Sequence, residues 1–279
     1  MRVAQLITSM RLVFSAFLLL FAIGHWPFAI VHAFDRSNVP LKNWGGFSIY
    51  RSWIYDALEK IVLAGLAEEV LLNSKPLNRV EAARIVSQAV RRLEWDKYGD
   101  YNHRGYLEDL LYKLVGEFGP ELAEMGVKTP LNRNGSAGFF TFKPVEHAEF
   151  GMGSVTRSQT VVNNSGQRFK KGATGISTLD GRIQVGDFLS FYYQPGFLRD
   201  NDTSRGRLLS GYGKLTLANT ELEVGRDSLW WGPGFRGSMS FSNNASPLDQ
   251  VRLSSAEPFR LPWLLSYLGP VKASLFVAQ

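Results

Sequence analysis

The sequence contains no cysteine and only four histidines among its 279 residues. Without cysteine no disulfide can stabilise the fold, so stability has to come from a hydrophobic core, a sheet or a lipid environment. His25 and His32 lie near the N-terminus, and the remaining pair, His103 and His147, are too few and too far apart in sequence to indicate a metal site. We therefore expect neither a metal nor a cofactor.

Strong charge of one sign is also missing. The formal net charge is +6 at pH 7, and a nucleic-acid-binding protein would gather lysine and arginine on one face. Only three short groups come close, at Arg91-Arg92, Arg168 to Lys171 and Arg205 to Arg207, and we interpret them as solvated turns. No nucleic-acid partner is predicted.

The N-terminal segment has the features of an export signal. Two arginines precede an apolar run from Leu12 to Ile23, and Val31-His32-Ala33 resembles a small-residue cleavage site. Removal of residues 1–33 takes away two arginines and no acids, so the net charge falls from +6 to +4. An uncleaved membrane anchor is the alternative, although residues 24–27 interrupt the run short of the ~20 residues that a spanning helix prefers.

A helical period extends from residue 51 to about residue 125. In the first segment the apolar residues recur at the spacing of one helix face; they are Ile54, Leu58, Ile61, Val62 and Leu66. Asn78, with Glu81 three residues later, forms a capping-box pattern that starts a second helix. A third helix is predicted from Arg104 to Phe118, ending near Gly119-Pro120. So small a unit is expected to lean on another surface.

From about residue 140 the hydrophobic period changes to two, which predicts an antiparallel meander of strands. The segments 181–195 and 205–227 alternate most clearly, and Ala218-Asn219-Thr220 is a short turn candidate. Further strands are predicted at 145–156, 172–180, 247–255 and 270–279. The alternation has flaws, since Asp187 falls on the side of Val185 and Leu189.

Two architectures explain this alternation. In a transmembrane barrel the apolar residues face lipid and the polar residues face the lumen, whereas in a soluble sandwich the apolar face covers a core. The barrel is the preferred interpretation. Residues 140–279 allow about eight to ten strands, and an open edge in lipid would leave backbone groups unpaired. The chain is therefore expected to be the first part of a longer barrel, with a signal at 1–33, a helical domain at 34–135 and barrel strands at 136–279.

One stretch, GRDSLWWGPGFRGSMSFSNNASP at 225–247, combines adjacent tryptophans, turn residues and neutral hydrogen-bonding side chains. Together with the following PFRLPWLLSYLGPVKASLFVA and the upstream VPLKNWGGFSIYRSWIYDALEKIVLAGLAE and KPLNRVEAARIV, it resembles the capsule assembly protein Wzi family of Gram-negative outer-membrane proteins. The resemblance implies a monomeric β-barrel of on the order of eighteen strands, with a helical bundle on the periplasmic side. It also implies a non-catalytic lectin that holds capsular polysaccharide at the cell surface, with that glycan and outer-membrane lipid as partners.

The same stretch supplies the candidate polysaccharide-binding residues, as flat rings, amides and charged groups suit sugar recognition. They are Arg226, Asp227, Trp230, Trp231, Arg236, Asn243 and Asn244. Strict alternation sends Arg226 toward lipid, at a cost of roughly 2 to 4 kcal/mol at the midplane. Either Gly225 marks a bulge that turns the guanidinium inward, or the strand has reached the membrane interface by that point.

Trp230 and Trp231 allow three interpretations: an interfacial belt that needs no ligand, a sugar platform, or packing that constricts the lumen. Because Pro233 lacks a donor, both rings are expected at a strand end or on a loop folded inward. If they form a platform, replacing either ring by alanine weakens glycan retention and leaves assembly intact.

Other functions remain open at this stage. Asp227 with Glu221 or Glu223 is a candidate carboxylate pair for glycoside hydrolysis, but acids on one barrel strand are more often lumen lining. A porin or transport channel with a wall-anchoring helical N-terminus is the main alternative, and a soluble exported sandwich is the third. Ion conductance favours the channel, whereas loss of cell-bound capsule on deletion favours the lectin.

Overall fold

The computed structural model describes residues 34–41, 53–95, 104–128, 138–161, 164–201, 203–232, 238 and 240–279. The predicted signal segment, His103 and Arg236 lie outside these residues. The helices are α2 (Trp53–Leu63), α3 (Arg79–Trp95), α4 (Arg104–Glu117), α5 (Gly119–Glu124) and the 3-10 helix η1 (Trp263–Leu268). Among the described helices, none combines the length and the apolarity that crossing a bilayer requires.

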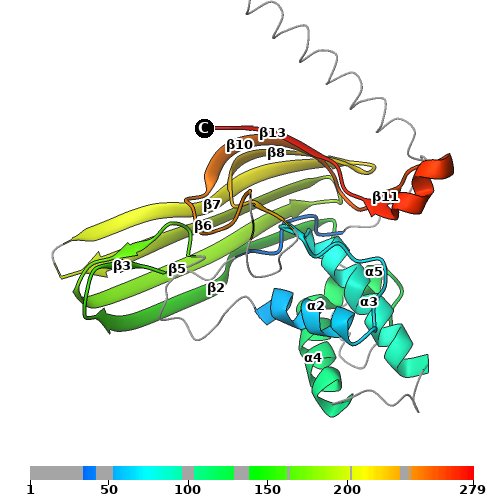
Figure 1. Ribbon diagram of the computed structural model, residues 1–279, viewed down its shortest axis with the longest axis horizontal. Coiled ribbons are helices and arrows are strands. Elements are labelled where there is room, and N and C mark those ends of the chain that lie inside the picture. The colour runs from blue at the N-terminus through cyan, green and yellow to red at the C-terminus, as the bar shows by residue number, and fades with distance from the viewer. Residues whose placement is uncertain are drawn as a thin grey trace, which may run out of the picture.

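Seven strands of the described chain form one antiparallel sheet in the order β13-β10-β8-β7-β6-β5-β2 (Figure 1). They are β2 (Phe140–Val155), β5 (Gly172–Val185), β6 (Leu189–Asp200), β7 (Ser204–Leu217), β8 (Thr220–Asp227), β10 (Leu248–Ser255) and β13 (Ser274–Ala278). Short strands occur at β1 (Ser74–Lys75), β3 (Gln159–Thr160), β4 (Arg168–Phe169), β9 (Trp230–Trp231), β11 (Phe259–Arg260) and β12 (Pro270–Val271). Within this region β2 and β13 are the two edges, so the sheet is open.

Strand boundaries explain the flawed alternation. Asp187 lies in the turn between β5, which ends at Val185, and β6, which begins at Leu189. The single strand expected over 181–195 is therefore wrong, and two strands replace it. The turn at Ala218 and Asn219 is confirmed between β7 and β8, with Ala218 at a positive φ of 51°.

The helices follow the predicted caps more closely than the predicted ends. The Asn78 side chain accepts a 2.7 Å hydrogen bond from the Glu81 backbone N–H, which confirms the N-cap of α3. The first helix, however, stops at Leu63, because Gly65 adopts a positive φ of 72° and turns the chain. The third helix is confirmed, since α4 ends at Glu117, and α5 then carries the helical region to Glu124, close to the expected limit at about residue 125, with Pro120 in its first turn.

Figure 1 places α2 to α5 together beside one end of the sheet. Their apolar faces share one buried cluster that includes Leu58, Ile61, Val86, Leu114 and Leu122. The expected need for a further surface is met by contacts with the sheet region. The Asn78 amide donates to the Ala256 carbonyl oxygen at 2.6 Å and to Glu221 at 3.2 Å.

The two faces of the sheet have the reverse polarity of a soluble protein. In β8 Glu221 and Glu223 are buried, while Leu222 and Val224 are exposed, Val224 to 51%. Other buried polar side chains on the same face are Arg182, Gln184, Ser190, Gln194, Lys214, Thr216, Gln250 and Arg252. Other exposed apolar side chains are Phe142, Phe150, Met152, Phe191, Phe197, Leu217, Val251 and Val277. A soluble sandwich covers its apolar face, whereas the described residues leave the apolar face of this sheet exposed.

The extended segment 34–41 and the helical unit cover the polar face at its helical end. Asp35 pairs with Arg182 of β5, and Asn38 donates to Glu223 at 2.8 Å and to Asp227 at 2.9 Å. Tyr212 of β7 accepts a 2.8 Å bond from the Asn38 backbone N–H. These contacts give several of the buried polar side chains of the strands protein partners in place of water.

Acid should loosen this docking. Burial opposes ionisation of Asp35 and Glu117, but nearby guanidinium groups outweigh it: Arg182 and Arg79 lower the pKa of Asp35, and Arg79 lowers the pKa of Glu117. A lowered folded-state pKa contributes stability that is complete above about pH 5 and is lost as the pH falls through the folded pKa. The backbone amides of α3 and α5 should be less protected from hydrogen exchange at pH 3 than at pH 7, after correction for the intrinsic pH dependence of exchange. An Arg79→Met variant should show a smaller pH effect, and an equal effect would contradict this assignment.

Candidate functional site

The conspicuous stretch at 225–247 leaves the sheet partway along its neighbour. β8 ends at Asp227, and Arg226 pairs with Gly211, about halfway along β7. From there the chain folds back toward the helical unit, where β9 pairs with β1 through Trp230 and Lys75. The expected loop folded inward is confirmed for its described residues.

Arg226 and Asp227 point to opposite faces. The register from Asp227 to Thr220 is continuous with β10, so the bulge proposed at Gly225 is absent. Gly225 has a φ of 141°, and because it has no Cβ its backbone lies close to Tyr212 of β7. An added Cβ would lie 2.6 Å from the Tyr212 Cα. Arg226 therefore keeps its outward direction and is paired with Asp249 of β10 at 2.5 Å. This pairing reduces the cost of an arginine on the apolar face.

Asp227 lies on the inner face, where it is 8% exposed. It accepts hydrogen bonds from the Ser210 hydroxyl and the Ser228 backbone N–H, each at 2.8 Å, in addition to that from Asn38. Glu223, four residues earlier on the same face, is held by Arg252 at 2.6 Å. Both carboxylates are therefore bound within the buried hydrogen-bond network, as expected for acids that line a lumen. Neither carboxylate faces an open space in which a sugar could lie between a hydrolytic pair.

Trp230 is packed inside the protein. Its side chain is only 4% exposed, and the Lys75 ammonium lies 5.1 Å from its ring centroid. Lys75 also lies 5.1 Å from the ring centroid of Tyr55 in α2, so one cation is shared by two aromatic faces. An interfacial belt or a sugar platform needs an accessible ring, and of the three interpretations only packing fits Trp230.

Trp231 belongs to an aromatic trio with Phe241 and Phe276. Its ring centroid lies 5.6 Å from that of Phe241 and 5.2 Å from that of Phe276, both edge to face. The Trp231 backbone N–H also donates to the Phe241 carbonyl oxygen at 3.0 Å. The trio ties the start and the end of the loop to β13, which is a structural role that sequence spacing does not reveal.

Asn243 and Asn244 lie on the other side of the loop, against a second connection. The Asn243 carbonyl oxygen accepts a 2.6 Å hydrogen bond from the Ser165 backbone N–H in the turn between β3 and β4. Gly166 of that turn has a φ of 65°, and a Cβ there would lie 2.9 Å from the Ser246 nitrogen. The two connections are therefore in close backbone contact at this point.

A cleft of about 390 Å³ opens in this part of the loop. It is lined by Ser228, Leu229, Ser240, Phe241, Ser242, Asn244, Ala245, Ser246, Pro247 and Leu248. Of the candidate residues that the structure describes, Asn244 alone lines it. Serine hydroxyls, an amide and one aromatic ring are neutral groups that can hydrogen-bond and stack on a sugar.

The spacing of residues in the sequence did not predict two charged clusters that the structure contains. Lys214 is fully buried, 3.3 Å from Glu221 and 3.8 Å from Glu223. At edge strand β2 a register irregularity brings the ligand atoms of Glu146, His147 and Asp180 within 4.8 Å of one another. Arg182 at 2.7 Å and Lys143 at 3.2 Å already balance the Glu146 charge, so this group is read as an ion-pair network.

These observations define a protein with an antiparallel sheet that is apolar outside and polar inside, and with a neutral cleft in an inward-folded loop. Residues 142–279 match the family model described as capsule assembly protein Wzi, which confirms over this segment the resemblance expected from the sequence. No match was found among curated proteins.

A solved structure has a similar fold. It is described as Wzi, an outer membrane protein involved in group 1 capsule assembly in Escherichia coli and a carbohydrate-binding β-barrel. The sequence identity is 16% and the TM-score 0.53, with 84% of this chain and 46% of that chain covered. The present chain thus spans about half the length of that solved chain.

Proposed function

We propose that this chain is part of an outer-membrane protein that binds capsular polysaccharide and helps to attach or assemble the capsule at the cell surface, without catalysing a reaction. One observation carries the proposal. The segment that matches the capsule assembly family also forms the sheet whose apolar face is exposed and whose polar face is buried. Such a sheet is at its most stable when lipid covers the apolar face and the chain closes into a barrel.

Further strands closing β13 against β2 would complete that barrel. The long strands have 12 to 16 residues, whereas a tilted strand needs only about 9 to 11 to cross a bilayer. Turn length does not orient the sheet, because short connections lie at the helical end, at 186–188 and 218–219, and also at the other end, between β6 and β7. The orientation follows instead from the resemblance stated from the sequence, which implies a helical bundle on the periplasmic side. We therefore place the helical unit, within the domain 34–135, in the periplasm, and assign 136–279 to the barrel.

We propose the 390 Å³ cleft in the loop as one glycan-binding site. The Asn243 carbonyl oxygen bonds the 156–171 connection and the Asn243 amide reaches the Leu41 carbonyl oxygen at 3.5 Å, whereas Trp230 pairs with Lys75. The loop is thus fixed on several sides, and the cleft between its two ends offers neutral hydrogen-bonding groups to a polymer. Asn244 is the direct contact carried over from the candidate residues, and Trp230, Trp231 and Asn243 hold the loop in place.

The test combines a cellular and a binding measurement. Deleting the gene in an encapsulated host should release capsule into the medium without stopping its synthesis. An Asn244→Ala/Ser242→Ala variant should weaken binding of purified capsular glycan about five-fold for each lost hydrogen bond, because one such bond contributes about 1 kcal/mol. Repeated sugar units multiply that loss in cell-bound capsule.

Ser204→Ala is the matched control, because Ser204 is exposed near the end of β7 and does not line the cleft. It should leave glycan binding unchanged. Equal binding by the cleft variant and this control would exclude the cleft as a site, while normal capsule retention in the deletion strain would exclude the function itself. The channel alternative is not favoured, because segment 34–41 occupies the polar face; steady ion conductance of the protein in planar bilayers would revive it.

A further inference from the structure

The connection between β10 and β13 carries a cluster of exposed apolar side chains outside the sheet and outside the proposed glycan-binding cleft. Residues 261–269, LPWLLSYLG, contain no charged side chain. Within η1, Trp263 is 92% exposed, Leu264 82% and Tyr267 89%. No residue of η1 is buried. In water such a cluster is costly, since each large apolar side chain gains by leaving water.

Local hydrogen bonds define the conformation of this segment. The Ser266 hydroxyl donates to the Trp263 carbonyl oxygen at 2.7 Å, and the Gly269 backbone N–H donates to the Ser266 carbonyl oxygen at 3.1 Å. Trp263 has a positive φ of 58°, a conformation that side-chain-bearing residues rarely adopt. Strain at a side chain that contacts little of the described protein points to a partner outside the chain.

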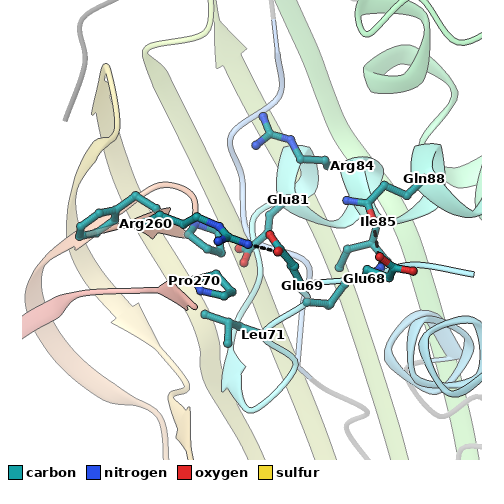
Figure 2. Close-up of a pocket in the computed structure, with 12 residues that line it drawn as sticks. Glu68, Glu69, Leu71, Glu81, Arg84, Ile85, Gln88, Arg260 and Pro270 are labelled. Atoms are coloured by element: carbon teal, nitrogen blue, oxygen red, sulfur yellow. Dashed lines mark hydrogen bonds and ion pairs between the residues drawn. The ribbon is translucent and has the colours of Figure 1, made fainter. Parts of the chain in front are cut away.

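The base of the segment is attached to the helical unit through charged contacts around a second cleft of about 390 Å³ (Figure 2). Arg260 pairs with Glu69 there, as the figure shows, and Lys272 pairs with Glu81 of α3 at 2.6 Å. Between them the strands β11 and β12 form a two-residue ladder that carries the segment. Any surface that binds η1 is therefore coupled mechanically to the helical unit.

Position and chemistry identify the surface. The connection that carries the segment begins beside the short turn at 218–219, where the Ala256 backbone N–H donates to the Asn219 carbonyl oxygen at 3.0 Å. Figure 1 places η1 next to the helical end of the sheet. Leu217, 62% exposed, continues the outward apolar face to that turn. Tryptophan and tyrosine beside such a band are the residues typical of the headgroup layer of a bilayer.

We propose that residues 261–269 form an interfacial anchor: they insert into the headgroup layer of the phospholipid leaflet on the helical side and thereby hold the helical unit against the membrane. The inference rests on the proposed function, since it needs the apolar face of the sheet to lie in lipid. It adds a lipid-binding element outside the strands.

The chain has no cysteine, so one introduced cysteine gives one spin label. Three variants of the full chain are placed in vesicles of phosphatidylethanolamine and phosphatidylglycerol: Leu264→Cys in η1, Val224→Cys on the outer face of β8, and Tyr112→Cys on α4, which is 64% exposed. Collision with oxygen reports lipid, and collision with a nickel chelate reports water. We expect the oxygen-to-nickel ratio at Leu264 to lie between the high value at Val224 and the low value at Tyr112.

Each other outcome has one meaning. A water-like value at Leu264 with a lipid-like value at Val224 overturns the anchor and leaves the membrane sheet standing. Low collision with both reagents at Leu264 means that protein covers η1, either a further segment of the chain or a second copy, and also overturns the anchor. A water-like value at Val224 overturns the proposed membrane location itself.

A label-free measurement guards against disturbance by the cysteine. The emission of Trp263 is obtained as the difference between the unaltered chain and a Trp263→Phe variant. Brominated phospholipids should quench this difference emission several-fold. A water-soluble quencher acting more strongly than the brominated lipid would contradict the insertion.

Discussion

Replacing Glu223 by leucine should destabilise the folded protein by about 3 to 5 kcal/mol, the cost of removing one partner from a buried ion pair. Glu223 is 1% exposed and accepts hydrogen bonds from Arg252 at 2.6 Å and Asn38 at 2.8 Å. Its loss leaves two buried cations, Arg252 and Lys214, with less compensation. Urea unfolding of the detergent-solubilised protein measures the change.

A double variant separates charge from packing. Glu223→Leu combined with Arg252→Met removes both charges, and replacement of a buried pair by apolar residues is often nearly neutral. At least half of the lost stability should return. If the single variant instead costs less than about 1 kcal/mol, the polar face is as well hydrated as a protein surface, and the close packing of segment 34–41 on it would be contradicted.

Replacing Trp230 by alanine is the second large effect, about 3 to 5 kcal/mol for a buried tryptophan. The ring fills the space between Lys75 and the loop, so its removal should also release residues 228–247 from the helical unit. Limited proteolysis of this loop, together with urea unfolding, measures both effects. The structure thus changes the expectation from sequence, in which either tryptophan variant weakened glycan retention while assembly stayed intact.

Trp263→Ala is the matched control, since the same side chain is removed from a position that is 92% exposed. In detergent it should shift stability by less than about 0.5 kcal/mol. Trp231→Ala, which loses the edge-to-face contacts with Phe241 and Phe276, should fall between the two. If Trp230→Ala and Trp263→Ala are equally mild, the packing role of Trp230 is wrong.

Local patterns predicted the helices and the strand region well because their causes are local. The cap at Asn78, the turn at Ala218 and the change of period near residue 140 depend on neighbours within a few positions. One error had a local cause as well: the alternation over 181–195 hid a turn at 186–188.

The candidate site was predicted only in part. The sequence indicated the stretch 225–247, but residue types could not tell an exposed ring from a buried one. Trp230 is buried because Lys75, more than 150 positions earlier, pairs with it. Arg226 faces outward as the alternation predicts, but its partner Asp249 belongs to the next sheet strand. The burial of Trp230 and the partner of Arg226 both depend on long-range pairing.

The sequence by itself determined the cysteine-free composition, the order of helices and then strands, and the alternation that assigns polar and apolar residues to opposite sheet faces. Period-two alternation is equally compatible with a buried apolar face and with a lipid-facing one. Only the tertiary structure decided which face the chain covers, because segment 34–41 and the helical unit cover the polar face through ion pairs and hydrogen bonds that join residues more than 100 positions apart.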